Sequence, residues 1–208
     1  MVHTEGFGKE RKIEMGVYDT ILKRRTVRKF KNEKIDREIL LKLVNAARHA
    51  PSAANLQPIK YLIVDDSEKV KDLFAHLKWA AYLAPDGTPG ENERPVAYII
   101  ILIDTEIRKS GYELDVGAAV QNILLAAEEE NIGTCWMGAI DREAIRKLFD
   151  IPDRYIIDTL VALGYKAESP VAEEENGSIK YYKDEKGVLH VPKRKLEDIV
   201  LFNKINQI

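Results

Sequence analysis

The sequence contains a single cysteine, Cys135, among its 208 residues. One cysteine cannot form a disulfide within the chain, and it cannot supply the paired thiols of a zinc motif. Because free cysteine is among the most frequently buried residue types, Cys135 is expected to be a small core residue.

The chain also lacks a long apolar run and an excess of positive charge. Its longest apolar run, residues 96–103, is far shorter than the roughly 20 residues that span a bilayer. The first fifteen residues carry charges of both signs and lack the apolar core of a signal peptide. We therefore expect a cytoplasmic protein with no membrane segment. The net charge of −2 gives no bulk basic surface for nucleic acid, so an anion site must come from a local cluster.

Length and composition predict one globular domain. Hydrophobic residues make up 45% and charged residues 32% of the chain, a mixture typical of folded proteins. A chain of this length has room for one substantial core. Residues 1–15 show little periodicity and are expected to form a flexible extension, which leaves residues 16–208 as the single domain.

Hydrophobic periodicity predicts helices and strands that alternate around one sheet, an α+β or α/β-like arrangement. Asp36, Ser67 and Asp141 are expected helix caps, Leu114 is expected to face the core, and Gly133 is expected to stop a helix. The acidic residues 166–177 are expected to form a loop. The expected helices cover 16–23, 36–50, 67–77, 112–131 and 141–148, and the expected strands cover 61–64, 96–103, 134–137 and 158–163, followed by a hairpin of 179–183 and 188–191.

Two clusters of positive charge could hold an anion. The first contains Arg24, Arg25, Thr26 and Arg28, and guanidinium groups match phosphate with two parallel hydrogen bonds. The second, Lys193 with Arg194, lies far along the chain. Both clusters would serve one doubly charged phosphate if the fold brings them together, and each would be a solvated surface if it does not.

The loop of residues 51–58 begins and ends with proline and is rich in small or uncharged polar residues. Ser52, Asn55 and Gln57 offer hydrogen bonds without charge, as the polar edge of a flat heteroaromatic ring requires. Pro51 fixes the loop, and the small Ala53 lets a ligand approach the backbone. An ordinary ordered turn would fit these residues equally well.

A glycine follows the expected strand at 134–137. Gly138 after Met137 would let a ligand contact the backbone at the strand end. A core strand followed by a turn glycine is the plainer alternative.

Taken together and in this order, the four segments resemble the nitroreductase family of FMN flavoproteins. The resemblance covers about residues 18–200, and its most specific part is the 51–58 loop, placed about 25 residues after the first arginines. Thr26 stands where serine is commoner, Ala53 where a second serine is common, and Ile59 where an aromatic is frequent. A proline common before residue 196 is replaced by Lys195. The Ala53 and Ile59 departures concern the substrate pocket more than the cofactor.

The resemblance implies a three-layer α+β fold with a central mixed or antiparallel sheet between helices. It implies a homodimer that binds FMN at the subunit interface and exchanges its C-terminal segment. The residues implied to contact the FMN phosphate and ribityl chain are Arg24, Arg25, Thr26 and Arg28. The same phosphate is implied to be reached by Lys193 and Arg194. Ser52 and Asn55 lie near the isoalloxazine and ribityl groups and come from the partner subunit. Cofactor binding is also expected of Pro51, Ala53 and Gln57 in the same loop, and the backbone of Met137 and Gly138 faces the N5 edge of the flavin.

The implied function is hydride transfer from NADH or NADPH, through the flavin, to a small oxidised acceptor in a ping-pong reaction. Because the cofactor performs the chemistry, no acid–base side chain and no metal are nominated. A specialised flavoenzyme of the dehalogenase, enone-reducing or flavin-fragmenting type and a non-catalytic flavin-binding protein remain alternatives. A nucleic-acid-binding module would use the same basic clusters, but the chain lacks interleaved aromatic residues.

Overall fold

The computed structural model describes residues 16–80, 83 and 87–205. The expected extension at 1–15 and part of the expected loop at 84–95 lie outside these residues. The helices are α1 (Val17–Lys23), α2 (Arg37–Arg48), α3 (Ser67–Phe74), α4 (Glu113–Glu129) and α5 (Arg142–Leu148). The strands are β1 (Ile59–Val64), β2 (Ala97–Asp104), β3 (Ile132–Met137), β4 (Tyr155–Tyr165), β5 (Val171–Glu174), β6 (Tyr182–Lys183) and β7 (Leu189–Lys193). Short 3₁₀ turns occupy Ala53–Asn55 and Glu91–Glu93.

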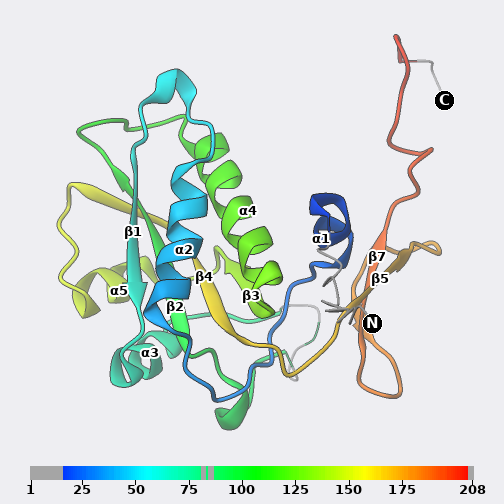
Figure 1. The fold of residues 1–208 in the computed structure, drawn as a ribbon, viewed down its shortest axis with the longest axis horizontal. Helices are drawn as coiled ribbons and strands as arrows, with labels where there is room; N and C mark the ends of the chain where they lie inside the picture. The colour runs from blue at the N-terminus through cyan, green and yellow to red at the C-terminus, as the bar shows by residue number, and fades with distance from the viewer. Residues whose placement is uncertain (1–15, 81–82, 84–86, 206–208) are drawn as a thin grey trace, which may run out of the picture.

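The strands form two separate sheets, so the expectation of a single sheet was wrong. The larger sheet has the order β1-β2-β4-β3, and all its neighbours are antiparallel. The smaller has the order β5-β7-β6, with one parallel and one antiparallel pairing. This small sheet forms a lobe beside the main body, and the chain runs from it into a C-terminal arm (Figure 1). The expected α+β class is confirmed.

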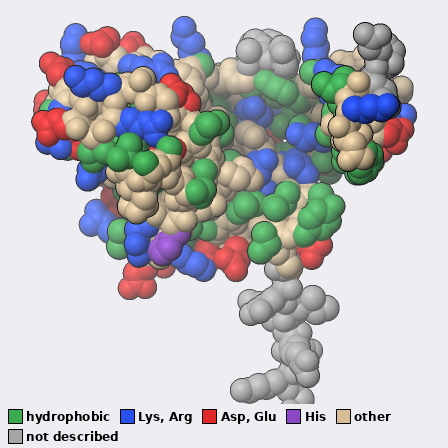
Figure 2. Space-filling model, turned by 90° about the horizontal axis from the view of Figure 1, so that it is seen from above, with side chains coloured by type: hydrophobic (Ala, Val, Ile, Leu, Met, Phe, Trp, Pro, Cys, Tyr) green, Lys and Arg blue, Asp and Glu red, His purple; other side chains and the backbone are tan. Residues whose placement is uncertain are grey.

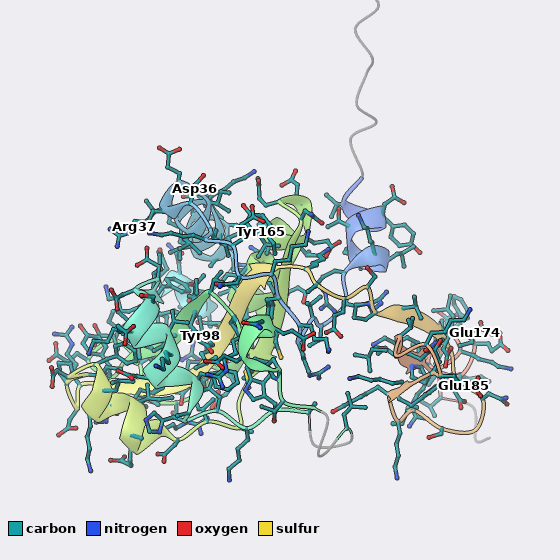
Figure 3. All side chains as sticks on the ribbon, turned by 90° about the horizontal axis from the view of Figure 1, so that it is seen from below. Asp36, Arg37, Tyr98, Tyr165, Glu174 and Glu185 are labelled. Carbon is teal, nitrogen blue, oxygen red and sulfur yellow. The ribbon has the colours of Figure 1, made fainter. Side chains whose placement is uncertain are left out.

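The body has three layers, as expected. Alternate residues of β2 face opposite sides of the sheet: Ile99 and Ile101 pack with α2 and α4, whereas Tyr98 and Ile100 pack with α3 and α5. Every residue of β2 is buried, which explains why this strand reads as an unbroken apolar run. Figure 3 shows Tyr98 deep in the body and Glu174 and Glu185 on the lobe.

Close packing, and not a helix end, explains the glycine at 133. Gly133 lies inside β3, where an added Cβ would sit 2.7 Å from Cγ1 of Val27. The expectation that it stops a helix was therefore wrong; α4 ends at Glu129, and the turn residue is Asn131, with a φ of 58°. Gly164 on the neighbouring strand makes room for Phe30 in the same way.

Three other expectations need correction. Leu114 is 86% exposed because the buried stripe of α4 passes through Asp115 and Val116 instead. Asp66, not Ser67, caps α3, and its carboxylate accepts from the N–H of Lys69. The acidic segment 166–177 contains β5, whose backbone pairs with β7 regardless of its charged side chains. No helix among the described residues is both long and apolar enough to cross a bilayer.

Candidate functional site

The first arginine cluster runs along the free edge of the large sheet. Thr26 forms a parallel bridge with Thr134 of β3, and the N–H of Val27 donates to the Thr134 carbonyl over 2.9 Å. Arg24, Thr26 and Arg28 are all half-buried. This pairing fixes the backbone of the cluster, because β3 is the last strand of its sheet.

A buried carboxylate, Glu128, lies beneath the cluster. Both of its oxygens accept from Nζ of Lys166 over 2.6 Å, and its side chain is only 3% exposed. Burial lowers the pKa of Arg24, the neighbouring Arg25 lowers it further, and Glu128 opposes both effects. The motifs in the sequence gave no sign of Glu128, although an acidic residue in the last turn of a helix opposes the helix dipole and is itself a signal.

The arginines of the cluster differ in whether their guanidinium groups already form hydrogen bonds within the chain. Arg25 donates from its guanidinium to the carbonyl of Leu22. Arg24 makes no side-chain hydrogen bond or ion pair with any described residue. A half-buried guanidinium without an acceptor favours the binding of an anion.

The lobe docks against this cluster. The carboxylate of Glu168 accepts from the N–H of Arg28 over 2.5 Å, and the guanidinium of Arg28 lies 5.2 Å from the ring centre of Tyr181. Lys193 and Arg194, at the end of β7, are both exposed. Figure 2 shows Lys and Arg side chains gathered in the hollow between the body and the lobe. The first basic cluster thus lies on the body, along β3, and the second lies on the lobe, at the end of β7.

The 51–58 loop is held by another buried carboxylate, Asp115 of α4. Its Oδ2 accepts from the hydroxyl of Ser52 over 2.7 Å, and its Oδ1 accepts from the N–H of Ala53 over 3.1 Å. Asp115 is 5% exposed. Sequence motifs did not indicate this residue, although a carboxylate within the apolar stripe of a helix was the available signal.

The loop is also strained. Ala54, Asn55 and Gln57 all have φ between 51° and 54°, a region that residues with a side chain rarely adopt. The amide of Gln57 donates to Oδ1 of Asn55 over 3.0 Å, so these two side chains hold each other on the surface. Pro51 and Ser52 line a shallow cleft of about 210 Å³ together with Asp115.

Gly138 follows β3 and is exposed, whereas Met137 before it is buried. An added Cβ at Gly138 would meet no atom within 4 Å, and its φ is not in the left-handed region. The space beside Gly138 is therefore open in the described chain, so the backbone at this strand end is accessible. Gly138 follows Thr134, the bridge partner of Thr26, by four residues, which is about 13 Å along the strand direction at a rise of roughly 3.3 Å per residue.

The structure does not bring all the predicted site residues together within one chain. Asp115 holds the 51–58 loop at the first turn of α4, whereas Glu128 lies beside the arginines at its last turn. The rise of about 1.5 Å per helical residue places these two ends about 20 Å apart. Figure 1 shows the loop between α2 and β1 at one end of α4 and the start of β3 at the other end.

Comparisons with known proteins identify the family of the chain. Residues 21–165 match the model of the nitroreductase family. A protein of Archaeoglobus fulgidus, named for NADH dehydrogenase and NAD(P)H nitroreductase activity, is 34% identical over 70% of this chain and 82% of its own. A Parabacteroides distasonis crystal structure with the same name has a TM-score of 0.67 and 26% identity over 91% of this chain and 98% of its own.

A further crystal structure, of a Desulfovibrio desulfuricans protein named as a nitroreductase, contains FMN. It has a TM-score of 0.65 and 25% identity, and the match covers 93% of this chain and 99% of that one. The family match spans well over half of the chain and includes the arginine cluster, the 51–58 loop and β3. The chain belongs to the nitroreductase family.

Proposed function

We propose that the chain is an FMN-dependent oxidoreductase that transfers hydride from NADH or NADPH to a small oxidised acceptor of the nitroaromatic, quinone or enone type. The two substrates would take turns at one site in a ping-pong reaction. The observation that carries the proposal is the half-buried guanidinium of Arg24 beside Thr26, which has no hydrogen-bond acceptor among the described residues, in a chain of this family. The names of the relatives, which include NAD(P)H and FMN, support it.

The residues present fit FMN. Arg24, Thr26 and Arg28 would hold its phosphate, with Lys193 and Arg194 reaching from across the hollow. The ring edge would lie at Gly138, where a Cβ would meet nothing of the protein. Residues 16–208 would together form this single FMN-binding domain.

The bound FMN supplies the ring position that accepts and donates hydride. The protein's own groups bind the phosphate, orient the ring and present backbone donors near Gly138, with no acid–base side chain required. Burial raises the pKa of the Cys135 thiol to about 11, so this thiol stays protonated at neutral pH and does not serve as a nucleophile.

The experiment that tests this function is an anaerobic titration of the FMN-loaded protein with NADH and with NADPH. We expect the visible absorbance of the oxidised flavin to bleach with at least one nucleotide and to return when a quinone is added. A protein that binds FMN but is not reduced by either nucleotide would contradict the proposed reaction. A protein that does not bind FMN would contradict the whole proposal.

A homodimer would complete the site. A ligand held by Arg24 would have to run the length of α4 to reach the 51–58 loop of its own chain, whereas the loop of a second copy can meet it directly. Val17 and Tyr18 on α1 are 73% and 71% exposed, and the C-terminal arm exposes a further apolar set. That set consists of Leu196, Ile199, Val200, Leu201, Phe202 and Ile205. Monomers rarely expose apolar surface on this scale, so we propose that the arm packs on a partner subunit.

Removing the arm should therefore change the oligomeric state. Deletion of residues 196–208 is expected to shift the protein from dimer to monomer, because the exposed apolar side chains of the arm would no longer bury surface on the partner. Sedimentation equilibrium of the full-length and shortened chains measures this directly. A full-length chain that is monomeric, or a shortened chain that remains dimeric at the same concentration, would contradict the proposed exchange.

The two glycines of the β3 region offer a matched pair for testing where the ring lies. Gly138→Ala should leave the free energy of unfolding within about 0.5 kcal/mol of the wild type, because the new Cβ meets no protein atom. It should weaken FMN binding by about tenfold, the effect of roughly 1.4 kcal/mol of overpacking against the ring.

Gly133→Ala is the control, since its Cβ would press against Val27. It should lower the free energy of unfolding by about 1–3 kcal/mol. Urea denaturation and flavin fluorescence titration of both variants provide the two measurements. Unchanged FMN affinity in the stable Gly138→Ala protein would place the ring elsewhere.

A further inference from the structure

The lobe contains a cluster of titratable side chains centred on His190 of the middle strand β7. The ring Nδ1 lies 2.7 Å from Oε2 of Glu173 in β5, and the ring Nε2 lies 3.4 Å from Oδ2 of Asp184. Tyr182 of β6 stacks on the imidazole, with ring centres 4.9 Å apart, and donates its hydroxyl to Glu173. The cluster therefore connects all three strands of the lobe through one side chain.

Both ring nitrogens face carboxylate oxygens, which only the protonated ring can satisfy. An imidazolium has two N–H donors, whereas a neutral imidazole has one donor and one lone pair. The neutral ring would point its lone pair at either Glu173 or Asp184. Within the described residues, no group of three His, Cys, Asp or Glu side chains is arranged to hold a metal ion.

The lobe depends on this cluster because its strands are short. They span only four, two and five residues, and strands of this length are marginal on their own. Asp184 also orders the β6–β7 turn, since its Oδ1 accepts from the N–H groups of Lys186 and Val188. The side-chain contacts of His190 thus supply cross-strand connections that the short backbone ladders do not.

The strand that carries His190 also carries the second basic cluster. Lys193 is the last residue of β7, where it pairs with Glu174, and its carbonyl accepts from the N–H of Glu175. Arg194 follows directly. The path of β7 therefore sets where these two cations lie relative to the hollow beside Arg28.

We propose that His190 is a positioning residue whose protonated ring clasps β5, β7 and β6 together and so holds Lys193 and Arg194 in place for a phosphate. The proposal rests on the function proposed above in taking that phosphate to be the one of FMN. The clasp makes FMN affinity depend on a proton that lies outside the flavin site.

The pH range of the clasp follows from the three groups that form it. The hydrogen bond to Glu173 is the largest cause that raises the pKa of His190, so the stability it gives is complete below the ordinary value of about 6.5 and is lost as pH rises through the raised value. The pKa of Glu173 is lowered, first by His190, and that of Asp184 is lowered, first by the N–H of Val188. Their contributions are present above ordinary carboxyl values and are lost in acid. The clasp is therefore complete between about pH 4.5 and about pH 6.5, and it is lost as pH rises through the raised pKa of His190.

The test compares FMN dissociation constants of the wild type and His190→Gln between pH 6 and pH 9. The glutamine variant should bind FMN about tenfold more weakly at pH 6, as the loss of one charge-assisted hydrogen bond would give. The ratio of the two constants should fall towards one as pH rises through the raised pKa of His190, because the wild-type ring then loses its second N–H donor. Ionisation of the FMN phosphate affects both proteins equally and cancels in the ratio.

Two further measurements keep the outcome clear. NMR titration of the His190 ring without flavin should give a pKa above 6.5, and Glu173→Gln should lower it; the midpoint of the affinity ratio should match this pKa. His49→Gln is the control, because it changes an exposed ring at the C-terminal end of α2. The FMN dissociation constants of this variant and of the wild type should be equal at every pH tested. A His190 pKa at or below 6.5 would overturn the clasp, and a ratio independent of pH would overturn its link to the phosphate. Failure of the wild type to bind FMN would instead contradict the proposed function, while the NMR titration still decides the clasp.

Discussion

Replacing Arg24 and Arg28 together by alanine is expected to raise the dissociation constant for FMN by about a hundred- to ten-thousand-fold. Each guanidinium would lose a charge-assisted hydrogen bond of roughly 1.5–3 kcal/mol to the phosphate, and about 1.4 kcal/mol corresponds to a factor of ten. Both side chains are half-buried, so water screens their attraction to a phosphate less than it would on an open surface. Quenching of FMN fluorescence on binding measures the change.

The matched control removes two lysines from a groove on another part of the body. Lys34→Ala with Lys71→Ala lowers the net charge by the same amount at a site away from the arginine cluster. This double variant should bind FMN within about twofold of the wild type, since exposed charges beyond a Debye length of roughly 8–10 Å are screened. Equal losses in the two double variants would mean that bulk charge, and not the arginine cluster, attracts the flavin.

Replacing Asp115 by alanine should be the most damaging single change to the candidate site. The substitution removes the acceptor of the Ser52 hydroxyl and of the Ala53 N–H, and it leaves Arg108 without a carboxylate 3.7 Å away. Hydrogen bonds to a charged group contribute roughly 1.5–3 kcal/mol each, so we expect the free energy of unfolding to fall by about 3 kcal/mol. Urea denaturation measures this loss.

The Asp115→Ala substitution should also release the 51–58 loop from its strained conformation. Left-handed backbone at Ala54, Asn55 and Gln57 costs on the order of 1 kcal/mol or more per residue and persists only where surrounding contacts impose it. Without Asp115 the loop should leave this conformation, and FMN affinity should fall even where the protein remains folded.

Two substitutions separate this effect from a general loss of charge in α4. Glu113→Ala, in the same helical turn but exposed, should change neither stability nor affinity by more than about 0.5 kcal/mol. Asp115→Asn keeps one oxygen for the Ala53 N–H and should lie between the wild type and Asp115→Ala. If Asp115→Ala behaves like Glu113→Ala, Asp115 does not anchor the loop.

The order and type of the main elements could be predicted because their signals are local. Helix α5 begins at an aspartate that caps it, and helix α2 shows its apolar stripe at positions 40, 43 and 47. Strand β2 is apolar throughout because helices cover both faces of its sheet. Strand β5 was missed because it forms through backbone pairing with β7, a long-range contact that its acidic side chains do not indicate.

Some residues of the candidate site also have local signals in the sequence, whereas others acquire their role only through tertiary packing. Arg24, Ser52 and Gly138 could be identified from motifs, because small spaced groups of residues are visible in one sequence. Asp115 and Glu128 could not, since their roles arise only when α4 packs beside the loop and the arginine cluster. The dependence of the lobe on His190 was equally invisible, because its carboxylate partners lie 17 and 6 residues away along the chain.

A crystal structure of the protein grown with FMN would test the central claim most directly. We expect the guanidinium groups of Arg24 and Arg28 within hydrogen-bonding distance of the phosphate, the ring against the backbone at Gly138, and the Ser52 loop of a second subunit beside it. A flavin that lies away from these arginines, or a single subunit that encloses it without help from another, would contradict the account.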